Sequence, residues 1–250
     1  MSLYREEAVV LRTHKLGEAD RIVVLMTGGR GKVRAVAKGI RKTKSRFGGR
    51  LEPPGHVSLL LYEGRNLDVI SQAETVDHHR PIREDLDRMT DALALVEAVD
   101  QVAQEGETNP PLFKMLTGAL RVLGEWDPRP ALLVGAFYWK LLALEGVAPV
   151  VDGCVRCGAP DTVSFDPVEG GTLCREHRRG TPVEGETLRL IQRILGGQLA
   201  AALGEPPGPT VSTVSHLATS TLEAHLERRL RTLHLMREVP GPGLRFTNLA

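Results

Sequence analysis

The sequence predicts an α+β protein of more than one domain, with an N-terminal five-stranded β-barrel, an α-helical domain and a small metal-binding insertion. Three observations lead to this prediction. Residues 1–80 contain five short apolar runs that are rich in β-branched side chains. After Pro81, apolar residues recur at intervals of three and four, as they do in amphipathic helices. Residues 150–180 lack this periodicity and contain all three cysteines of the chain.

The five apolar runs are separated by Gly, Asn or Pro, which is typical of short strands joined by turns. They cover residues 8–13, 21–27, 32–39, 56–62 and 67–74. Five strands in about 75 residues favour a small closed barrel, because closure leaves no exposed strand edge. An open five-stranded sheet that packs on the helical part is the alternative.

The helical periodicity predicts a helical domain over residues 81–149 and 181–250, interrupted by the insertion at 150–180. Pro110 and Pro111 suit the first turn of its second helix. The predicted helices cover residues 82–105, about 110–125, 130–145, 184–203 and 210–236.

The charge of the chain is unevenly distributed. Its 32 Lys and Arg residues and 31 Asp and Glu residues give a net charge of +1. Residues 21–51 hold ten of the basic residues and no acidic one, which leaves 22 basic against 31 acidic residues elsewhere, a net charge of −9. One strongly basic region on an otherwise acidic protein indicates a polyanionic partner.

A Gly-Lys pair at Gly31 and Lys32 suggests a nucleotide-phosphate loop as one interpretation of this region. Such a loop needs a glycine five residues before the Gly of the pair and a Ser or Thr after the Lys. The sequence has Met26 and Val33 at these positions. Because the following KVRAVAKG alternates as a strand does, GGRG is predicted to be a hairpin turn.

The same alternation predicts a cationic strand face. Residues two apart share a face of a strand, so Lys32, Arg34, Val36 and Lys38 would face outward, opposite the small residues between them. Unbalanced like charges repel one another, which favours binding to a nucleic-acid backbone over a face selected for solubility. With aromatic residues at only 4 %, a tight sequence-specific binder is not expected. The expected phosphate contacts are Lys32, Arg34, Lys38, Arg41, Lys42, Lys44, Arg46 and Arg50.

Cys154, Cys157, Cys174 and His177 form the pattern C-x2-C-x16-C-x2-H. Each close pair can place two ligand atoms on one ion, and thiolates with a neutral imidazole suit Zn²⁺. Four protein ligands fill a tetrahedral site and leave no position for a reacting water, so the pattern predicts a structural zinc ion. A coincidental grouping of three free cysteines is the alternative.

No catalytic motif stands out in the sequence. The chain has neither a deaminase H-x-E pairing nor an H-E-x-x-H helix, so a protein that is not an enzyme is predicted. No apolar run approaches the ~18–20 residues of a membrane helix. The first residues, MSLYREEAVV, do not resemble a signal peptide, so the expected location is the cytoplasm.

Two stretches resemble the bacterial recombination-repair mediators of the RecO family. The first is EEAVVLRTHKLGEADRIVVLMTGGRGKVRAVAKGIRKTKSRFGGRLEPP followed by LLLYEGRNLDVISQAE, and the second is FYWKLLALEGVAPVVDGCVRCG. The resemblance implies an OB-fold over residues 1–80 that binds DNA through the basic residues named above, a helical domain and a zinc-binding insertion at 150–180. Family members with the zinc motif often have four cysteines, whereas His177 takes the fourth place here.

The resemblance also implies a function. RecO-like proteins bind single- and double-stranded DNA, anneal complementary strands, and act with RecR and single-stranded-DNA-binding protein to load RecA in gap and double-strand-break repair, which places them at the nucleoid. Annealing needs no fuel, because base pairing supplies the free energy. A zinc-dependent nuclease and an RNA-binding OB-fold factor remain as alternatives.

The last predicted helix offers a candidate site for a partner peptide. Leu226 and Leu230 belong to an apolar stripe, and Arg228 and Arg229 lie beside it. Such a surface suits an acidic tail that ends in a hydrophobic residue, and the resemblance implies that single-stranded-DNA-binding protein provides one. The simpler interpretation is a core stripe with a solvated basic edge.

Overall fold

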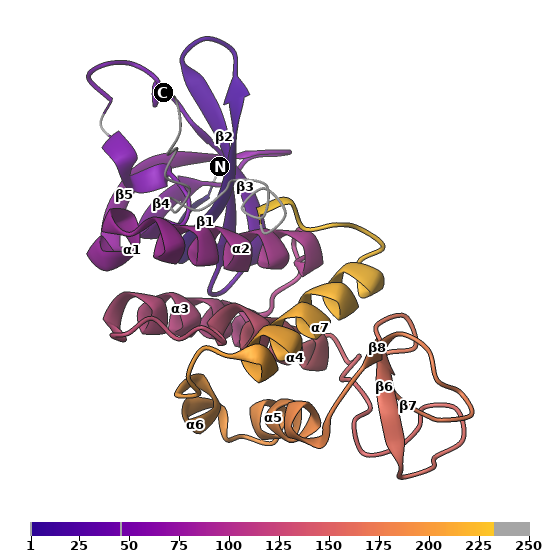
Figure 1. Cartoon of the computed structure of the whole chain (residues 1–250). Coiled ribbons are helices and arrows are strands. Elements are labelled where there is room, and N and C mark those ends of the chain that lie inside the picture. Colours follow the sequence, from indigo (N-terminus) through magenta and orange to yellow (C-terminus); the bar gives the residue numbers. More distant parts are fainter. Residues whose placement is uncertain (1, 46, 233–250) are drawn as a thin grey trace, which may run out of the picture.

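Five strands close into a barrel at the N-terminal end of the chain (Figure 1). The computed structural model describes residues 2–45 and 47–232. The order around the barrel is β1-β2-β3-β5-β4, with β3 and β5 parallel and the other neighbours antiparallel. The closed, OB-like barrel is thus confirmed, and the open sheet is not formed. The strands are β1 Leu3–Leu16, β2 Asp20–Thr27, β3 Gly31–Ala37, β4 His56–Tyr62 and β5 Asp68–Asp77.

The middle of β1 and the second half of β2 are buried on both faces. In β1, Ala8 and Val10 belong to the core inside the barrel, whereas Val9 and Leu11 belong to the core shared with the helices. The same alternation holds along β2. A strand with two buried faces needs a continuous apolar sequence, which explains the runs AVVL and IVVLM.

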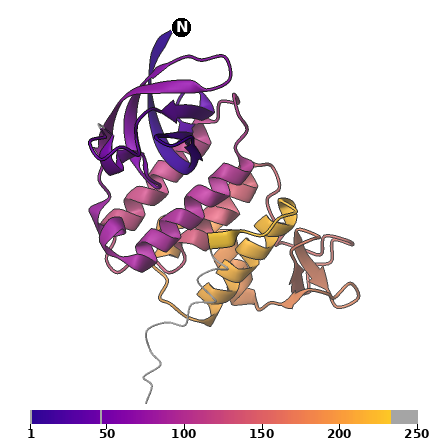
Figure 2. The ribbon, with the colours of Figure 1, turned by 90° about the horizontal axis from the view of Figure 1, so that it is seen from above.

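The helices pack against one side of the barrel. Helix α2 lies directly beside the barrel, and α3, α4, α5 and α7 lie behind it (Figures 1 and 2). Within residues 2–45 and 47–232, no helix is both long enough and apolar enough to cross a membrane. The helices are α1 Arg80–Glu84, α2 Leu86–Val102, α3 Pro110–Glu125, α4 Leu133–Leu144, α5 Gly185–Leu195, α6 Leu199–Leu203 and α7 Pro209–His225.

Two predicted helices are in fact each divided in two. The helix predicted over 82–105 is interrupted at Asp85, whose extended backbone ends α1. The Asp85 carboxylate accepts a hydrogen bond from Arg88 N (2.9 Å) and so caps the start of α2. The helix predicted over 184–203 breaks at Gly197, whose φ of 90° lies outside the helical region.

A small antiparallel sheet follows α4 and lies to one side of the helices (Figure 1). It consists of β6 Thr162–Asp166, β7 Gly171–Cys174 and β8 Thr181–Pro182, in the order β7-β6-β8. The ring of Phe165 meets Trp139 of α4 edge-on, with ring centroids 5.8 Å apart. These strands were not predicted, because runs of two to five residues are too short for their periodicity to be recognised.

Candidate nucleic-acid interface and metal centre

The Gly-Lys segment is a hairpin turn between β2 and β3, as the sequence predicts. Gly29 N donates to Glu6 Oε2 (3.0 Å), so this amide already has a protein partner. Gly31 has a φ of 66°, and a Cβ at this position would lie 1.8 Å from the carbonyl oxygen of Glu107. Glycine is therefore required at position 31 by the close contact with the α2–α3 loop.

Lys32, expected on the outer face of β3, is turned toward helix α2. Its Nζ lies 3.0 Å from Asp100 Oδ1 and donates to the carbonyl oxygens of Asp100 (2.6 Å) and Ala103 (3.1 Å). From β1, Arg12 Nε lies 2.7 Å from Asp100 Oδ2. Only 11 % of the Lys32 side chain and 6 % of the Asp100 side chain are exposed. The expected solvent position is wrong because α2 covers this end of β3, and Lys32 instead joins the barrel to the end of α2.

Three more cations of the basic stretch have acidic partners from elsewhere in the chain. All of these side chains are at least one-quarter exposed, so each pair contributes roughly 0–1 kcal/mol to stability. Val36, expected to face outward, is 9 % exposed. Folding therefore places acidic side chains from outside residues 21–51 beside part of the basic stretch. The pairs are Arg21 with Glu52, Arg30 with Glu63 and Arg34 with Glu105.

Four exposed cations remain in the loop that follows β3, and none forms an ion pair with any residue that the structure describes: Lys38, Arg41, Lys42 and Lys44. Ile40, Phe47 and Leu51 anchor this loop in the barrel core. Arg50 is also exposed and donates to the carbonyl oxygen of Phe47 (3.3 Å). Arg46 lies outside the described residues. Because its apolar residues are fixed, the loop presents a positive surface to a polyanion.

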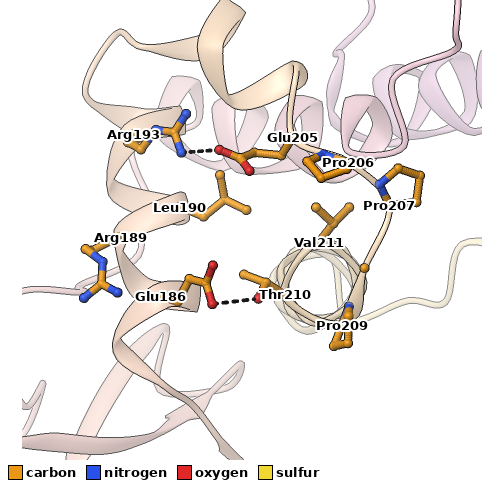
Figure 3. Close-up of a pocket in the computed structure, with 11 residues that line it drawn as sticks. Glu186, Arg189, Leu190, Arg193, Glu205, Pro206, Pro207, Pro209, Thr210 and Val211 are labelled. Atoms are coloured by element: carbon orange, nitrogen blue, oxygen red, sulfur yellow. Dashed lines mark hydrogen bonds and ion pairs between the residues drawn. The ribbon is translucent and has the colours of Figure 1, made fainter.

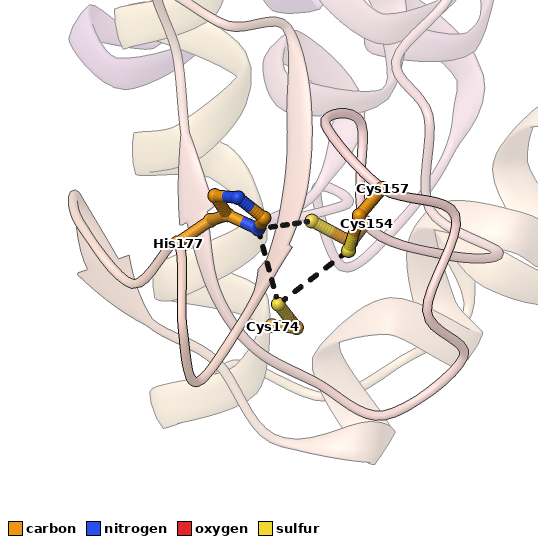
Figure 4. Close-up of side chains that lie close together, drawn as sticks. All are labelled: Cys154, Cys157, Cys174 and His177. Carbon is orange, nitrogen blue, oxygen red and sulfur yellow. Dashed lines mark hydrogen bonds between the residues drawn. The ribbon is translucent and has the colours of Figure 1, made fainter.

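Cys154, Cys157, Cys174 and His177 come together as the sequence predicts (Figure 4). Cys174 Sγ lies 3.8 Å from Cys157 Sγ and 3.3 Å from His177 Nδ1, and Cys154 Sγ lies 3.7 Å from His177 Nδ1. A tetrahedral ion with bonds of about 2.3 Å to sulfur and about 2.0 Å to nitrogen places its ligands about 3.5–3.8 Å apart. The four side chains therefore fit around one metal ion.

Backbone hydrogen bonds favour negative sulfur at Cys154 and Cys174, where they lower the thiol pKa. Burial opposes ionisation of Cys154, but N–H donors of Cys174, Arg156 and Cys157 outweigh it and lower the pKa of this thiol to about 6. Hydrogen bonding to Cys174 and Cys154 raises the pKa of His177. Since the thiolate is the form that binds metal, this environment suits a cation.

The four arginines near the cluster are Arg156, Arg175, Arg178 and Arg179. Arg156 Nη2 lies 2.8 Å from Glu169 Oε1, and Arg179 Nε lies 3.0 Å from Asp166 Oδ2. All four arginines are exposed, and Arg156 and Arg179 have acidic partners, whereas Arg175 and Arg178 form no ion pair with the residues that the structure describes.

The helix predicted over residues 210–236 is shorter than expected. Helix α7 ends at His225, and Glu227 has a φ of 50°, so the chain leaves the helical path there. Glu97 of α2 then accepts hydrogen bonds from the N–H groups of Arg231 and Thr232, each 2.8 Å long. Residues 233–236 lie outside the described part of the chain.

Leu226 and Leu230 do not form an exposed apolar stripe. Leu230 is 1 % exposed, and Leu226 packs against the helical core. Arg228 Nη1 donates to Gln101 Oε1 of α2 (2.8 Å), whereas Arg229 is exposed. The burial thus agrees with the simpler interpretation, a core stripe with a basic edge.

An apolar groove that the sequence analysis did not identify lies between α3, α4 and α6. Its volume is about 290 Å³, and its apolar lining includes Met115, Val122, Phe137 and Leu203. Lys114, Arg121 and Lys140 also line it and form no ion pair within the described residues. A sequence signal did exist, since Lys114 and Arg121 are two helical turns apart and so share one face of α3.

A cleft of about 380 Å³ separates α5 from the start of α7 (Figure 3). Arg193 of α5 pairs with Glu205, and Thr210 Oγ1 of α7 donates to Glu186 Oε2 (3.4 Å). Arg189 also lines the cleft, and no ion pair of this side chain is found within residues 2–45 and 47–232. The carboxylates of Glu186 and Glu205 are engaged across the cleft, so it offers no free negative charge to a ligand.

The barrel, the helical region and the Cys3His cluster define an OB-barrel protein with a helical framework and a candidate metal module. The family model described as Recombination protein O N terminal matches residues 1–79, and Recombination protein O C terminal matches residues 83–234. A protein named DNA repair protein RecO from a Nocardioides species is 42 % identical over 240 residues, which cover 92 % of this chain and 98 % of that protein. The chain belongs to the RecO family of DNA repair proteins.

Proposed function

We propose that this protein binds DNA without sequence preference, anneals complementary single strands and, with RecR and single-stranded-DNA-binding protein, promotes RecA loading in gap and double-strand-break repair. The observation that carries this proposal is the loop after β3, with four exposed cations that lack an acidic partner among the described residues. Annealing requires the repulsion between two strands to be screened while their bases remain free to pair. A cationic surface poor in aromatic side chains meets that requirement.

The proposed DNA contacts are narrower than those that the sequence predicts. Lys32 is engaged with α2 and is assigned a structural role, and Arg34 pairs with Glu105 across 3.6 Å at the edge of the surface. With four or five phosphate contacts on a single strand, the slope of log affinity against log salt concentration would be about −2.8 to −3.5. The proposed contacts are Lys38, Arg41, Lys42, Lys44 and Arg50.

DNA binding is tested with two double variants of equal net charge. Lys38→Gln with Lys44→Gln removes two proposed contacts. Arg175→Gln with Arg189→Gln removes two exposed cations, one directly after β7 and one in α5, which are elements away from the barrel (Figure 1). Each lost phosphate contact costs about 0.7 log units of affinity at about 0.1 M salt, so the first variant should bind single-stranded DNA about 25-fold more weakly. Equal losses in both variants would contradict the assignment of the surface.

For the partner tail, we propose the groove between α3, α4 and α6 rather than the edge at Arg228 and Arg229. An acidic peptide that ends in a hydrophobic residue needs an accessible apolar site beside cations. The groove offers the half-buried Met115, Val122 and Leu199 beside Arg121, whereas Leu230 is buried in the helical core and Leu226 packs against that core.

Fluorescence anisotropy with an acidic, hydrophobic-ended peptide compares the two sites. Arg121→Glu should weaken binding at least tenfold, because it places a like charge beside the acidic residues. A variant with Arg228→Glu and Arg229→Glu should bind as the wild type does. The reverse pattern would return the site to the end of α7.

We propose that the ion held by Cys154, Cys157, Cys174 and His177 is Zn²⁺ and that its role is structural. Three thiolates and one imidazole are the donor set that zinc prefers, and four protein ligands leave no open position for a reacting water. We therefore propose a protein without enzymatic activity, located in the cytoplasm at the nucleoid. A nuclease assay with and without chelator tests the zinc-dependent nuclease, and competition between single-stranded DNA and RNA tests the RNA-binding factor.

We also propose the domain division made from the sequence: an OB-fold over residues 1–80, a helical domain over 81–149 and 181–250, and a metal-binding insertion over 150–180. The strands of the barrel end at Asp77, which supports the first boundary. Limited proteolysis followed by mass spectrometry would test these boundaries.

A further inference from the structure

A hollow of about 400 Å³ lies where the barrel meets α1. Its lining comes from the loop that includes Arg50, from the start of β4 at His56, and from the segment between Asp77 and Arg83. This volume falls within the range of small-molecule sites, roughly 300–1,000 Å³. The hollow continues the basic loop, because Arg50 belongs to the same segment as the exposed cations that follow β3.

Arg83 is the cation that α1 contributes to this hollow. Its Nε donates to the carbonyl oxygen of His78 (3.1 Å), and this bond orients the guanidinium. Arg83 forms no ion pair with the residues described, because the acid nearest in sequence, Glu84, pairs with Arg80 (2.7 Å). A guanidinium held by a neutral carbonyl keeps its charge and its remaining donors for an anion.

The one acidic residue that lines the hollow is already engaged. Asp77 Oδ1 accepts a hydrogen bond from His79 N (2.8 Å), and Asp77 Oδ2 lies 3.3 Å from His79 Nδ1. His56 Nε2 is likewise paired with Glu7 Oε1 (2.7 Å). Arg83 is therefore the lining cation that keeps donors for a ligand, and with Arg50 and the exposed His78 on the same lining the hollow favours an anion.

We propose that this hollow binds one nucleotide of a DNA strand through its phosphate, with Arg83 and Arg50 as the phosphate contacts. This site rests on the proposed DNA binding. It adds a path for the DNA strand, which would run from the basic loop toward α1. Arginine suits this role because its planar donors match the oxygens of a phosphate.

The test compares Arg83→Gln with Arg80→Gln in the full chain. Both remove one positive charge from α1, but Arg80 does not line the hollow. The affinity for a thymidine oligonucleotide is measured from about 50 to about 300 mM salt. Arg83→Gln should reduce the magnitude of the log–log slope by about 0.7 and weaken binding about fivefold at about 0.1 M salt, whereas Arg80→Gln should change neither.

Two controls separate the outcomes. Arg83→Lys keeps the charge and should restore most of the slope, and urea unfolding identifies any loss of fold in Arg83→Gln. If the wild type binds DNA but Arg83→Gln and Arg80→Gln behave alike, the nucleotide site is refuted and the proposed function stands. If the wild type does not bind DNA, both are refuted.

Discussion

Replacing Lys32 by Met tests whether this lysine belongs to the fold or to the DNA-binding surface. Methionine has a similar length and removes the charge. The substitution leaves Arg12 as the remaining cation beside Asp100, whose side chain is only 6 % exposed. It also removes the amino group that donates to the carbonyl oxygens of Asp100 and Ala103. Removal of one partner from a buried ion pair costs about 3–5 kcal/mol.

Because Arg12 still neutralises Asp100, we expect the lower end of that range, about 3 kcal/mol. For a chain of this size, 1 kcal/mol changes Tm by about 2–4 °C, so Tm should fall by about 6–12 °C. The matched control is Lys38→Met, since Lys38 is exposed on the same strand-and-loop segment. It should change stability by less than about 0.5 kcal/mol.

The assay combines urea unfolding with DNA binding at a temperature where every variant is folded. Lys32→Met should have a lower free energy of unfolding than the wild type but a similar affinity for DNA. Lys38→Met should have wild-type stability and a lower affinity for DNA. Wild-type stability of Lys32→Met, or a loss of DNA affinity as large as that of Lys38→Met, would contradict a structural role for Lys32.

Three further predictions concern the metal site, pH and one turn. Metal analysis should give about one zinc ion per chain. Either a chelator or the substitution Cys174→Ser should lower the protection of backbone amides from hydrogen exchange in the small sheet but not in the barrel. Unchanged protection would contradict a structural role for the metal. Burial lowers the pKa of His79 from its ordinary 6.5. The unfolded chain therefore takes up a proton first as pH falls, so stability present above about pH 6.5 should decline below it, and His79→Gln should flatten this decline in urea titrations. Gly31→Ala should cost about 2 kcal/mol or more in unfolding free energy, because φ is 66° and its Cβ would meet Glu107; a neutral effect would contradict the turn geometry.

What the sequence could predict depends on how local the signal is. The grouping of Cys154, Cys157, Cys174 and His177 was predictable, because these residues occur as two close pairs and only one loop had to bring the pairs together. The barrel was predicted because apolar runs of seven or eight residues separated by turn residues are distinctive. The strands near the cysteines were missed because runs of two and four residues contain too few repeats for an alternating pattern to be recognised.

Contacts between residues that are far apart in the sequence could not be predicted from local patterns. Lys32 and Asp100 are 68 positions apart, so no strand pattern indicates that α2 covers one end of β3. The groove between α3, α4 and α6 likewise depends on how three helices pack. The stripe at Leu226 and Leu230 was ambiguous because a core face and a docking face have the same periodicity, and only burial separates them.

We propose that the cationic loop after β3 enables the protein to anneal complementary DNA strands without nucleotide hydrolysis. The most direct measurement is the rate at which two complementary oligonucleotides anneal in the absence of nucleotide, with wild-type protein and with the variant Lys38→Gln, Lys44→Gln. We predict clear acceleration by the wild type, little by this variant, and wild-type rates for the charge-matched Arg175→Gln, Arg189→Gln. Annealing that is no faster with the wild type than without protein would contradict the claim.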